Sequence, residues 1–151
     1  MDGSDAQAAW TPREVGEGEW AGWRLWSGDP FERLAGPFYS RREPDETMVC
    51  AFRAEEKHMN GAGFMHGGCL LTFADFALFC FAEQAIAGVR SVTASLNAEF
   101  VDAARIGELI EARGEVIRDA RSMVFVRGLL TAAERPLMSF SGIIKKTRPR
   151  P

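Results

Sequence analysis

The fold is decided by the stretch His58-Met59-Asn60-Gly61-Ala62-Gly63-Phe64-Met65-His66-Gly67-Gly68 and by the apolar run that follows it, from Cys69 to Ala87. The stretch concentrates glycines and polar side chains in one loop, and the run carries a single carboxylate near its start, Asp75. The length of this segment and its high content of Leu, Ala and Phe predict one helix over residues 66–87, buried on most sides. Because the first N–H groups of a helix lack partners, the loop and helix start together predict a site for negative charge.

Six β-prone runs flank this predicted helix, at residues 38–42, 47–54, 91–101, 108–118, 122–132 and 137–146. The segments between the last four runs are short, which predicts that these runs form an antiparallel meander. Along residues 91–101, Thr93, Ser95, Asn97 and Glu99 alternate with apolar residues, which predicts one polar and one apolar face. Only the helix is long and apolar enough to cover the apolar face. We therefore predict an α+β fold, a curved antiparallel sheet of about six strands wrapped around one long central helix.

The chain divides into an N-terminal extension (1–29), one domain (30–147) and a short basic tail (148–151). We expect residues 1–10 to be mobile, because they are small and polar, and the tail to fray. A capping-box pattern at Thr11-Pro12-Arg13-Glu14 predicts a short helix, and a second one is predicted at Asp29–Leu34. Trp20, Trp23 and Trp26 recur every three residues and predict a packed aromatic lid.

Composition argues against several functional classes. The formal net charge is −3, from 18 basic and 21 acidic residues, which gives no support for nucleic-acid binding. The longest apolar run is too short to span a bilayer and the N-terminus lacks the features of a signal peptide, so we expect a soluble, cytoplasmic protein without a membrane partner. Cys50, Cys69 and Cys80 have no paired spacing, which fits reduced and buried thiols.

Two further kinds of site can be weighed in the same stretch. A metal site would have to gather His58, His66, Cys69 and Asp75, but their spacing matches no common zinc pattern, so we predict no metal. The run Gly61–His66 differs from a dinucleotide-binding fingerprint at one position, where His66 stands in place of the last Gly. The run also lacks the surrounding βαβ units. We therefore reject a dinucleotide site.

The loop, the helix and the next strand resemble the hotdog-fold acyl-CoA thioesterases, in particular the branch related to the phenylacetate-pathway thioesterases. The matching signature is Asn60-(x)2-Gly63-(x)2-His66-Gly67-Gly68-(x)6-Asp75, followed by the strand Val92–Asn97 and the step Arg105-Ile106-Gly107-Glu108. The resemblance covers residues 30–147. There are two departures from the family pattern: Asp102-Ala103 replaces a dipeptide that usually ends in proline, and Ala120 replaces a common glycine. Both lie at strand ends and bear on local loop shape and acyl specificity more than on the chemistry.

The resemblance implies hydrolysis of an acyl-CoA thioester to a carboxylic acid and coenzyme A, with coenzyme A as part of the substrate and no separate cofactor. Asp75 is then the catalytic carboxylate, as a general base on water or as a nucleophile, and the Gly67 N–H polarises the thioester carbonyl. This chemistry is reasonable, because N–H donors stabilise a developing oxyanion and a water molecule needs a base within reach. The remaining implied roles belong to Asn60 and His66, which shape the loop and place the substrate, and to Thr93, which holds the attacking water.

Substrate-binding candidates come from the loop and from the ends of strands. Gly63 and Gly68 belong to the loop signature, and a glycine such as Gly68 lets a ligand approach the backbone. Coenzyme A carries phosphates, so basic residues at predicted strand ends, Arg90, Arg121 and Lys145, are candidates to bind them. The alternative for any one of them is an ordinary solvated surface charge.

Spacing predicts the assembly. Gly67 and Asp75 are eight residues apart on one helix, which places them about 12 Å apart along its axis. Both groups must lie about 3 Å from one reacting group. We therefore predict a two-fold homodimer with antiparallel central helices and two shared sites. We also expect two such dimers to pair into a homotetramer, although the spacing does not decide between dimer and tetramer.

Other readings stay open at this point. The chain could be a non-catalytic hotdog protein that binds or senses acyl-CoA, although such a protein would lose the carboxylate that Asp75 supplies. A hotdog dehydratase is a further alternative, but the His-Gly-Gly loop and Asp75 differ from the His and Glu of that branch. Asp75 could also be structural, satisfied by a neighbouring hydroxyl such as that of Thr72, although burying a carboxylate without a cation is costly.

Overall fold

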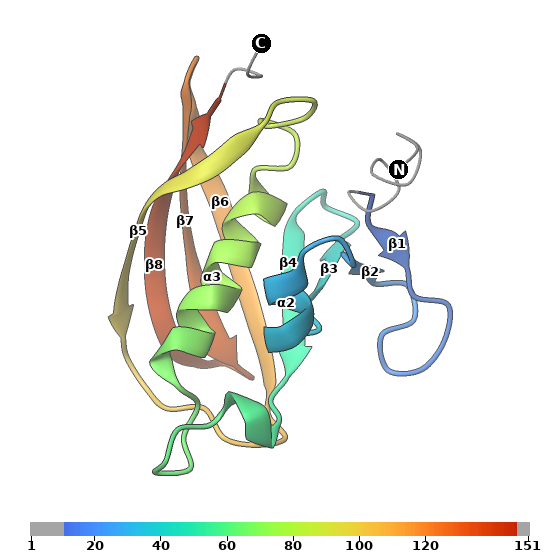
Figure 1. The fold of residues 1–151 in the computed structure, drawn as a ribbon, viewed down its shortest axis with the longest axis vertical. Helices are drawn as coiled ribbons and strands as arrows, with labels where there is room; N and C mark the ends of the chain where they lie inside the picture. Colours follow the sequence, from blue (N-terminus) through green and yellow to red (C-terminus); the bar gives the residue numbers. More distant parts are fainter. Residues whose placement is uncertain (1–10, 148–151) are drawn as a thin grey trace.

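A computed structural model describes residues 11–147 as one antiparallel sheet curved around a long helix (Figure 1). The strands are β1 (Arg13–Glu14), β2 (Arg24–Leu25), β3 (Tyr39–Arg42), β4 (Met48–Arg53), β5 (Ser91–Phe100), β6 (Leu109–Asp119), β7 (Met123–Ala132) and β8 (Arg135–Lys146). The helices are α2 (Pro30–Ala35), the 3-10 turn η1 (Glu56–His58) and α3 (Gly67–Phe81). The α+β prediction is confirmed, with eight strands in place of about six.

Helix α3 forms the centre of the core, as predicted. Its buried residues include Phe73, Ala77 and Leu78, and they pack against the inner faces of β4, β6, β7 and β8. The helix ends at Phe81, earlier than the predicted end at residue 87. Just beyond that end, the Glu83 carboxylate is held 2.8 Å from both Arg24 and Arg42. These ion pairs come from distant strands, so no local pattern in the sequence indicates them.

The six predicted strands are confirmed to within two residues at each end, but the predicted order is wrong at one place. The sheet runs β1-β2-β3-β4-β6-β7-β8-β5, with every neighbouring pair antiparallel. The meander holds for β6, β7 and β8. Strand β5 lies at the sheet edge beside β8, because β4 occupies the edge of β6 that the prediction gave to β5.

The extension adds to the same sheet. The predicted short helix at Thr11–Glu14 is wrong, because residues 13–14 pair with β2 as a two-residue strand. Trp20 stacks on Tyr39 with ring centroids 4.1 Å apart, and Trp23 is buried edge-on beside it. The predicted aromatic lid is therefore confirmed for these two rings over β3 and β4, while Trp26 packs against the main core.

The second predicted short helix is confirmed as α2. The Asp29 side chain caps it by accepting the Glu32 N–H at 3.0 Å, and the helix ends at Gly36. Figure 1 places α2 beside α3, on the side of α3 that faces away from β7 and β8. This position brings α2 close to the middle of the central helix.

Some predictions concern features outside the sheet and helices. Those for residues 1–10 and for the tail 148–151 lie outside the described residues. The three cysteines are free thiols, with Cys50 and Cys80 buried and Cys69 half-buried. Within residues 11–147, no helix combines the length and the hydropathy needed to cross a bilayer.

Candidate active site

The loop before α3 is shaped by Asn60. Its side-chain oxygen accepts the N–H groups of Ala62 and Phe64 at 2.9 and 3.1 Å, and the Asn60 N–H donates to the Phe64 carbonyl at 2.6 Å. Gly63 has a φ of +82°, a backbone conformation that favours glycine. Asn60 and Gly63 therefore fix a tight turn that returns the chain to the start of α3.

His66 is the N-cap of α3. Its Nδ1 accepts the Gly68 N–H at 2.8 Å, so in the neutral ring the proton lies on Nε2, and the residue as a whole is exposed. This bond satisfies one of the unpaired N–H groups at the helix start. The Gly68 N–H therefore already has a partner within the chain, although Gly68 itself is exposed to solvent.

Gly67 is the first residue of α3, and its N–H has no partner among the described residues. A donor at this position lies at the positive end of the helix dipole, which favours an anion or a developing oxyanion. A Cβ on Gly67 would lie 3.2 Å from the Phe100 ring, at the end of β5. The helix start is therefore in contact with the last residue of the edge strand.

Asp75 lies halfway along α3 and is half-buried. The Thr93 hydroxyl donates to its Oδ1 at 2.5 Å, which leaves Oδ2 available to another donor. The Thr72 hydroxyl instead donates to the Gly68 carbonyl at 2.8 Å, so Thr72 does not satisfy this carboxylate.

A β-bulge brings Thr93 to Asp75. Strict alternation along β5 predicts that Thr93 shares the polar face with Asn97 and Glu99. The pairing with β8 shifts between Thr93 and Ser95, which turns Thr93 toward α3 and leaves Val92 exposed. Bulges commonly re-aim side chains beside active sites. The alternation prediction is therefore wrong for Thr93, and its implied place beside Asp75 depends on this irregularity.

A second carboxyl group, missed by the sequence reading, lies near Asp75. Burial, followed by the negative charges of Asp29 and Asp75, raises the pKa of Glu32 in α2 to about 7. The cap at Asp29 predicted the helix that carries Glu32, but only the packing of α2 on α3 shows that the two carboxyl groups share a neighbourhood.

The basic candidates gather at the opposite end of α3 from Gly67. Arg90 precedes β5, Arg121 lies in the turn between β6 and β7, and Lys145 lies near the end of β8. Pairing of Met123 with Lys145, and a bond of 2.7 Å from the Thr147 N–H to the Arg90 carbonyl, place these segments side by side. The side chains of all three are exposed and free to meet a phosphate.

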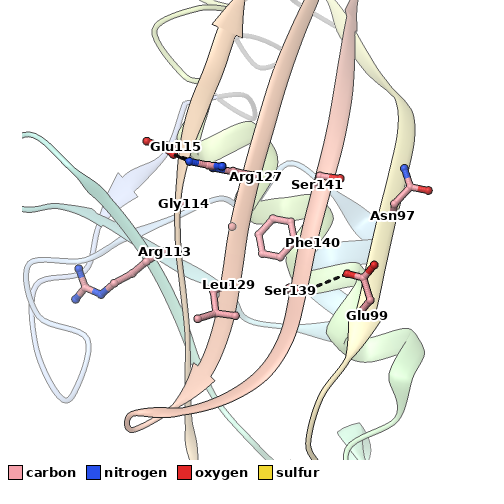
Figure 2. Close-up of a pocket in the computed structure, with 11 residues that line it drawn as sticks. Asn97, Glu99, Arg113, Gly114, Glu115, Arg127, Leu129, Ser139, Phe140 and Ser141 are labelled. Carbon is pink, nitrogen blue, oxygen red and sulfur yellow. Dashed lines mark hydrogen bonds and ion pairs between the residues drawn. The ribbon is translucent and has the colours of Figure 1, made fainter.

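One further hollow lies away from these residues. It has a volume of about 610 Å³ and opens on the face of β5–β8 that points away from α3 (Figure 2). Polar side chains such as Asn97, Ser139 and Ser141 line it, and the Glu115–Arg127 ion pair crosses its rim. None of the predicted catalytic residues lines this hollow. In residues 11–147, no three His, Cys, Asp or Glu side chains are grouped so that they could hold a metal ion.

Comparison with known proteins adds to this geometry. A family model described as the thioesterase superfamily matches residues 62–139. The chain is 34% identical over 120 residues to a Pseudomonas aeruginosa protein named “putative esterase”, a match that covers 79% of this chain and 90% of that protein. It is 29% identical over 105 residues to human acyl-coenzyme A thioesterase 13, which covers 67% of this chain and 72% of the human protein. A solved structure of a hypothetical thioesterase with coenzyme A from Streptococcus pneumoniae has a TM-score of 0.66 at 19% identity, covering 76% of this chain and 88% of that one.

Proposed function

Because the chain belongs to the thioesterase superfamily, we propose that it is an acyl-CoA thioesterase, which hydrolyses the thioester to a carboxylic acid and coenzyme A. The family assignment confirms the resemblance to hotdog thioesterases. The names of the human and streptococcal proteins support acyl-CoA as the substrate class. The observation that carries the proposal is that one helix holds both an open N–H, at Gly67, and a carboxylate, Asp75, that is oriented by Thr93.

The chemistry follows from these groups. The Gly67 N–H donates to the thioester oxygen and stabilises the negative charge that develops there as the carbonyl is attacked. Asp75 takes the proton of the attacking water through its free oxygen, or attacks the carbonyl itself and is released by water. In the first route the C–S bond breaks after water has added to the carbonyl, and the departing thiolate of coenzyme A takes up the proton that Asp75 accepted. In the second route the C–S bond breaks as the acyl–Asp75 anhydride forms, the thiolate is protonated by solvent, and water then hydrolyses the anhydride and restores the carboxylate. Thr93 fixes Asp75 and has a second lone pair that can hold the water.

The two halves of this site come from different subunits in our proposal. On one chain, Gly67 and Asp75 are separated along α3 by about 12 Å, too far to act on one carbonyl. Strand β5 is an uncovered edge of the sheet, with Val92 and Phe100 each more than half exposed. An exposed edge with apolar side chains is suited to pair with another strand. A two-fold axis through β5 would join two sheets and set the two α3 helices antiparallel.

The contacts of β5 also suggest its register. Thr93 bonds to Asp75, and Phe100 lies against Gly67. Pairing Thr93 with Phe100 of the partner subunit would therefore bring Asp75 to Gly67 of the partner subunit. The same pairing repeats by symmetry, so each dimer has two equal sites.

In this dimer, the basic end of each subunit lies on the Asp75 side of a shared site. Arg90, Arg121 and Lys145 would then bind the phosphates of coenzyme A, with the thioester between Asp75 and Gly67 of the partner subunit. Pairing of dimers into a tetramer stays a prediction that native mass spectrometry can test. The cytoplasmic location likewise stays a prediction.

A thiol-release assay over short, medium, long and aromatic acyl-CoAs tests the proposed function. We expect hydrolysis of at least one class by the wild-type chain. Asp75→Asn, which keeps the size of the side chain and the bond from Thr93, should lower kcat by a factor of about 100 or more, as expected when a catalytic base is lost. A wild-type chain that binds acyl-CoA without hydrolysing any would contradict the proposal and favour the acyl-CoA-sensing alternative.

A further inference from the structure

His58 is a buried histidine for which the proposed chemistry has no role. Only 4% of its surface is exposed, and its ring packs edge-on against Phe52, with the ring centroids 5.0 Å apart. Its Nδ1 lies 2.9 Å from the Glu55 N–H, and its Nε2 lies 2.7 Å from the Ala35 carbonyl oxygen. Since an N–H only donates and a carbonyl only accepts, Nδ1 is bare and Nε2 carries the proton. The two partners therefore select one neutral tautomer.

The Nε2 bond holds the end of α2. The last carbonyls of a helix have no partner within it. Here the Ala35 carbonyl is bound by His58, and the Gly36 carbonyl is bound by Lys57 Nζ at 2.5 Å. The adjacent side chains of η1 thus fasten α2 to the chain just before the active-site loop. Since α2 carries Glu32 and packs on α3, its position affects the surroundings of Asp75.

The backbone of His58 holds the other side of the site. Its carbonyl accepts the His66 N–H at 2.8 Å, and Met59 and Met65 form an isolated antiparallel bridge next to it. The loop that contains Asn60 and Gly63 therefore leaves and returns at His58. The residue that follows His66 is Gly67, the proposed oxyanion donor. His58 is thus bonded both to the end of α2, through its ring, and to the end of the loop before Gly67, through its backbone carbonyl.

We propose that His58 is a positioning residue, whose ring fastens α2 beside Asp75 while its backbone fastens the loop that aims the Gly67 N–H. This inference rests on the proposed function, since it assigns His58 a part in the same site. The ring must stay neutral to do so, because a second ring proton on Nδ1 would face the Glu55 N–H. Burial is the main cause that lowers the pKa of His58, and the charge of Lys57 acts in the same direction, against the bond to Ala35 and the charge of Glu55.

Three substitutions separate the two ring bonds. In His58→Gln the side-chain amide can still donate to Ala35 from a position near that of Nε2. In His58→Asn the side-chain oxygen can replace Nδ1 as acceptor for the Glu55 N–H, but the side chain is too short to reach α2. His58→Leu keeps the bulk of the residue and removes both bonds. The Gln and Asn variants are matched in polarity and each keeps one of the two ring bonds, so their comparison sets the connection to α2 against the bond from the Glu55 N–H.

Steady-state kinetics with an acyl-CoA, combined with hydrogen exchange of the amides in α2 and in residues 59–67, tests the inference. We expect His58→Asn and His58→Leu to lower kcat at least tenfold, with KM changed less than threefold, and to speed exchange in α2. His58→Gln should stay within threefold of wild type in kcat and exchange. A purely structural role would lower the melting temperature and the fraction of folded enzyme without this split between the Gln and Asn variants.

Equal kcat in His58→Gln and His58→Asn would overturn the inference, as would slow, wild-type exchange of α2 in His58→Asn. If His58→Leu does not fold, the Gln and Asn pair still decides. If the wild-type chain hydrolyses no acyl-CoA, the proposed function fails by itself. The exchange data then still show whether His58 connects α2 to the loop, and the supporting result is faster exchange of α2 in His58→Asn but not in His58→Gln.

Discussion

Mixed dimers should rebuild an active site from two inactive chains, because each proposed site takes Gly67 from one subunit and Asp75 from the other. The two lesions are Gly67→Pro and Asp75→Asn. Gly67 is the first residue of α3, where proline is well tolerated because its missing N–H has no helical partner. The ψ of His66 is 133°, within the range favoured before proline. Gly67→Pro therefore removes the proposed donor and leaves the helix start intact.

The loss expected from Gly67→Pro follows from the role of the donor. Removing one oxyanion donor lowers kcat by about 10²–10³, or about 2.7–4 kcal/mol of transition-state stabilisation. Gly67→Ala is the matched control, since it keeps the N–H and adds a similar Cβ 3.2 Å from the Phe100 ring. We expect the Ala variant to lose far less activity than the Pro variant. A difference between the two variants then reports the N–H and not the contact with Phe100.

The mixture provides the quantitative test of shared sites. Random reassociation of equal amounts of Gly67→Pro and Asp75→Asn chains gives about half heterodimers, each with one intact site and one doubly damaged site. The mixture should recover about a quarter of wild-type kcat per chain, although each parent is nearly inactive. Heterodimers isolated by two different affinity tags should reach about half of wild-type kcat per chain, because one of their two sites is intact.

Two results would refute the reasoning. If each chain held a complete site, every chain in the heterodimer would carry one lesion, and no activity would return. If Gly67→Pro were as active as Gly67→Ala, the N–H would have no part in the reaction. A wild-type preparation that is fully active as a monomer would contradict the shared site as well.

Two further predictions concern the carboxyl groups near the middle of α3. Thr93→Val removes the hydroxyl that orients Asp75 and should lower kcat about tenfold, consistent with the loss of a hydrogen bond to a charged group. In the same thiol-release assay, Thr93→Ser keeps the hydroxyl and should stay near wild type in kcat. Burial raises the pKa of Glu32 from 4.5 to about 7, so stability that is present below pH 4.5 is lost as the pH rises through 7. Glu32→Gln should therefore raise the free energy of unfolding at pH 8 by about 1–2 kcal/mol, a value discounted for solvent screening, and by little at pH 4.5. Equal urea midpoints of Glu32→Gln and wild type at both pH values would contradict this.

The sequence predicted the local elements well because their signals are local. The cap at Asp29 and the glycine loop before Gly67 each contain the groups that begin a helix, and the helices begin there. The two-residue strands β1 and β2 carry too little pattern to be recognised. They exist because β1 pairs with β2 and β2 pairs with β3, and a segment of two residues is too short to show the alternation of a strand.

The position of β5 in the sheet shows that sequence patterns do not predict strand order. Short separators made a four-stranded meander the natural prediction, but they do not show which strand takes the free edge of β6. Strand β4 takes it, so β5 is left at the outer edge beside β8. This difference bears on function, because only an edge strand can pair with a second copy of the chain. The dimer was predicted from the spacing of Gly67 and Asp75, and the observed strand order supplies an edge suited to it.

The site itself depends on two features that residue types alone do not reveal. Asp75 and Thr93 meet because a bulge in β5 breaks the alternation that would have turned the hydroxyl away from α3. Glu32 and His58 matter because α2 folds back onto the central helix, although the sequence shows α2 only as a short capped segment. A helix can offer an open N–H only at its start, while Asp75, the carboxylate that we propose works with it, is fixed two turns further along. A single α3 cannot bring the two groups together, and so an antiparallel second copy is the simplest arrangement that satisfies the chemistry.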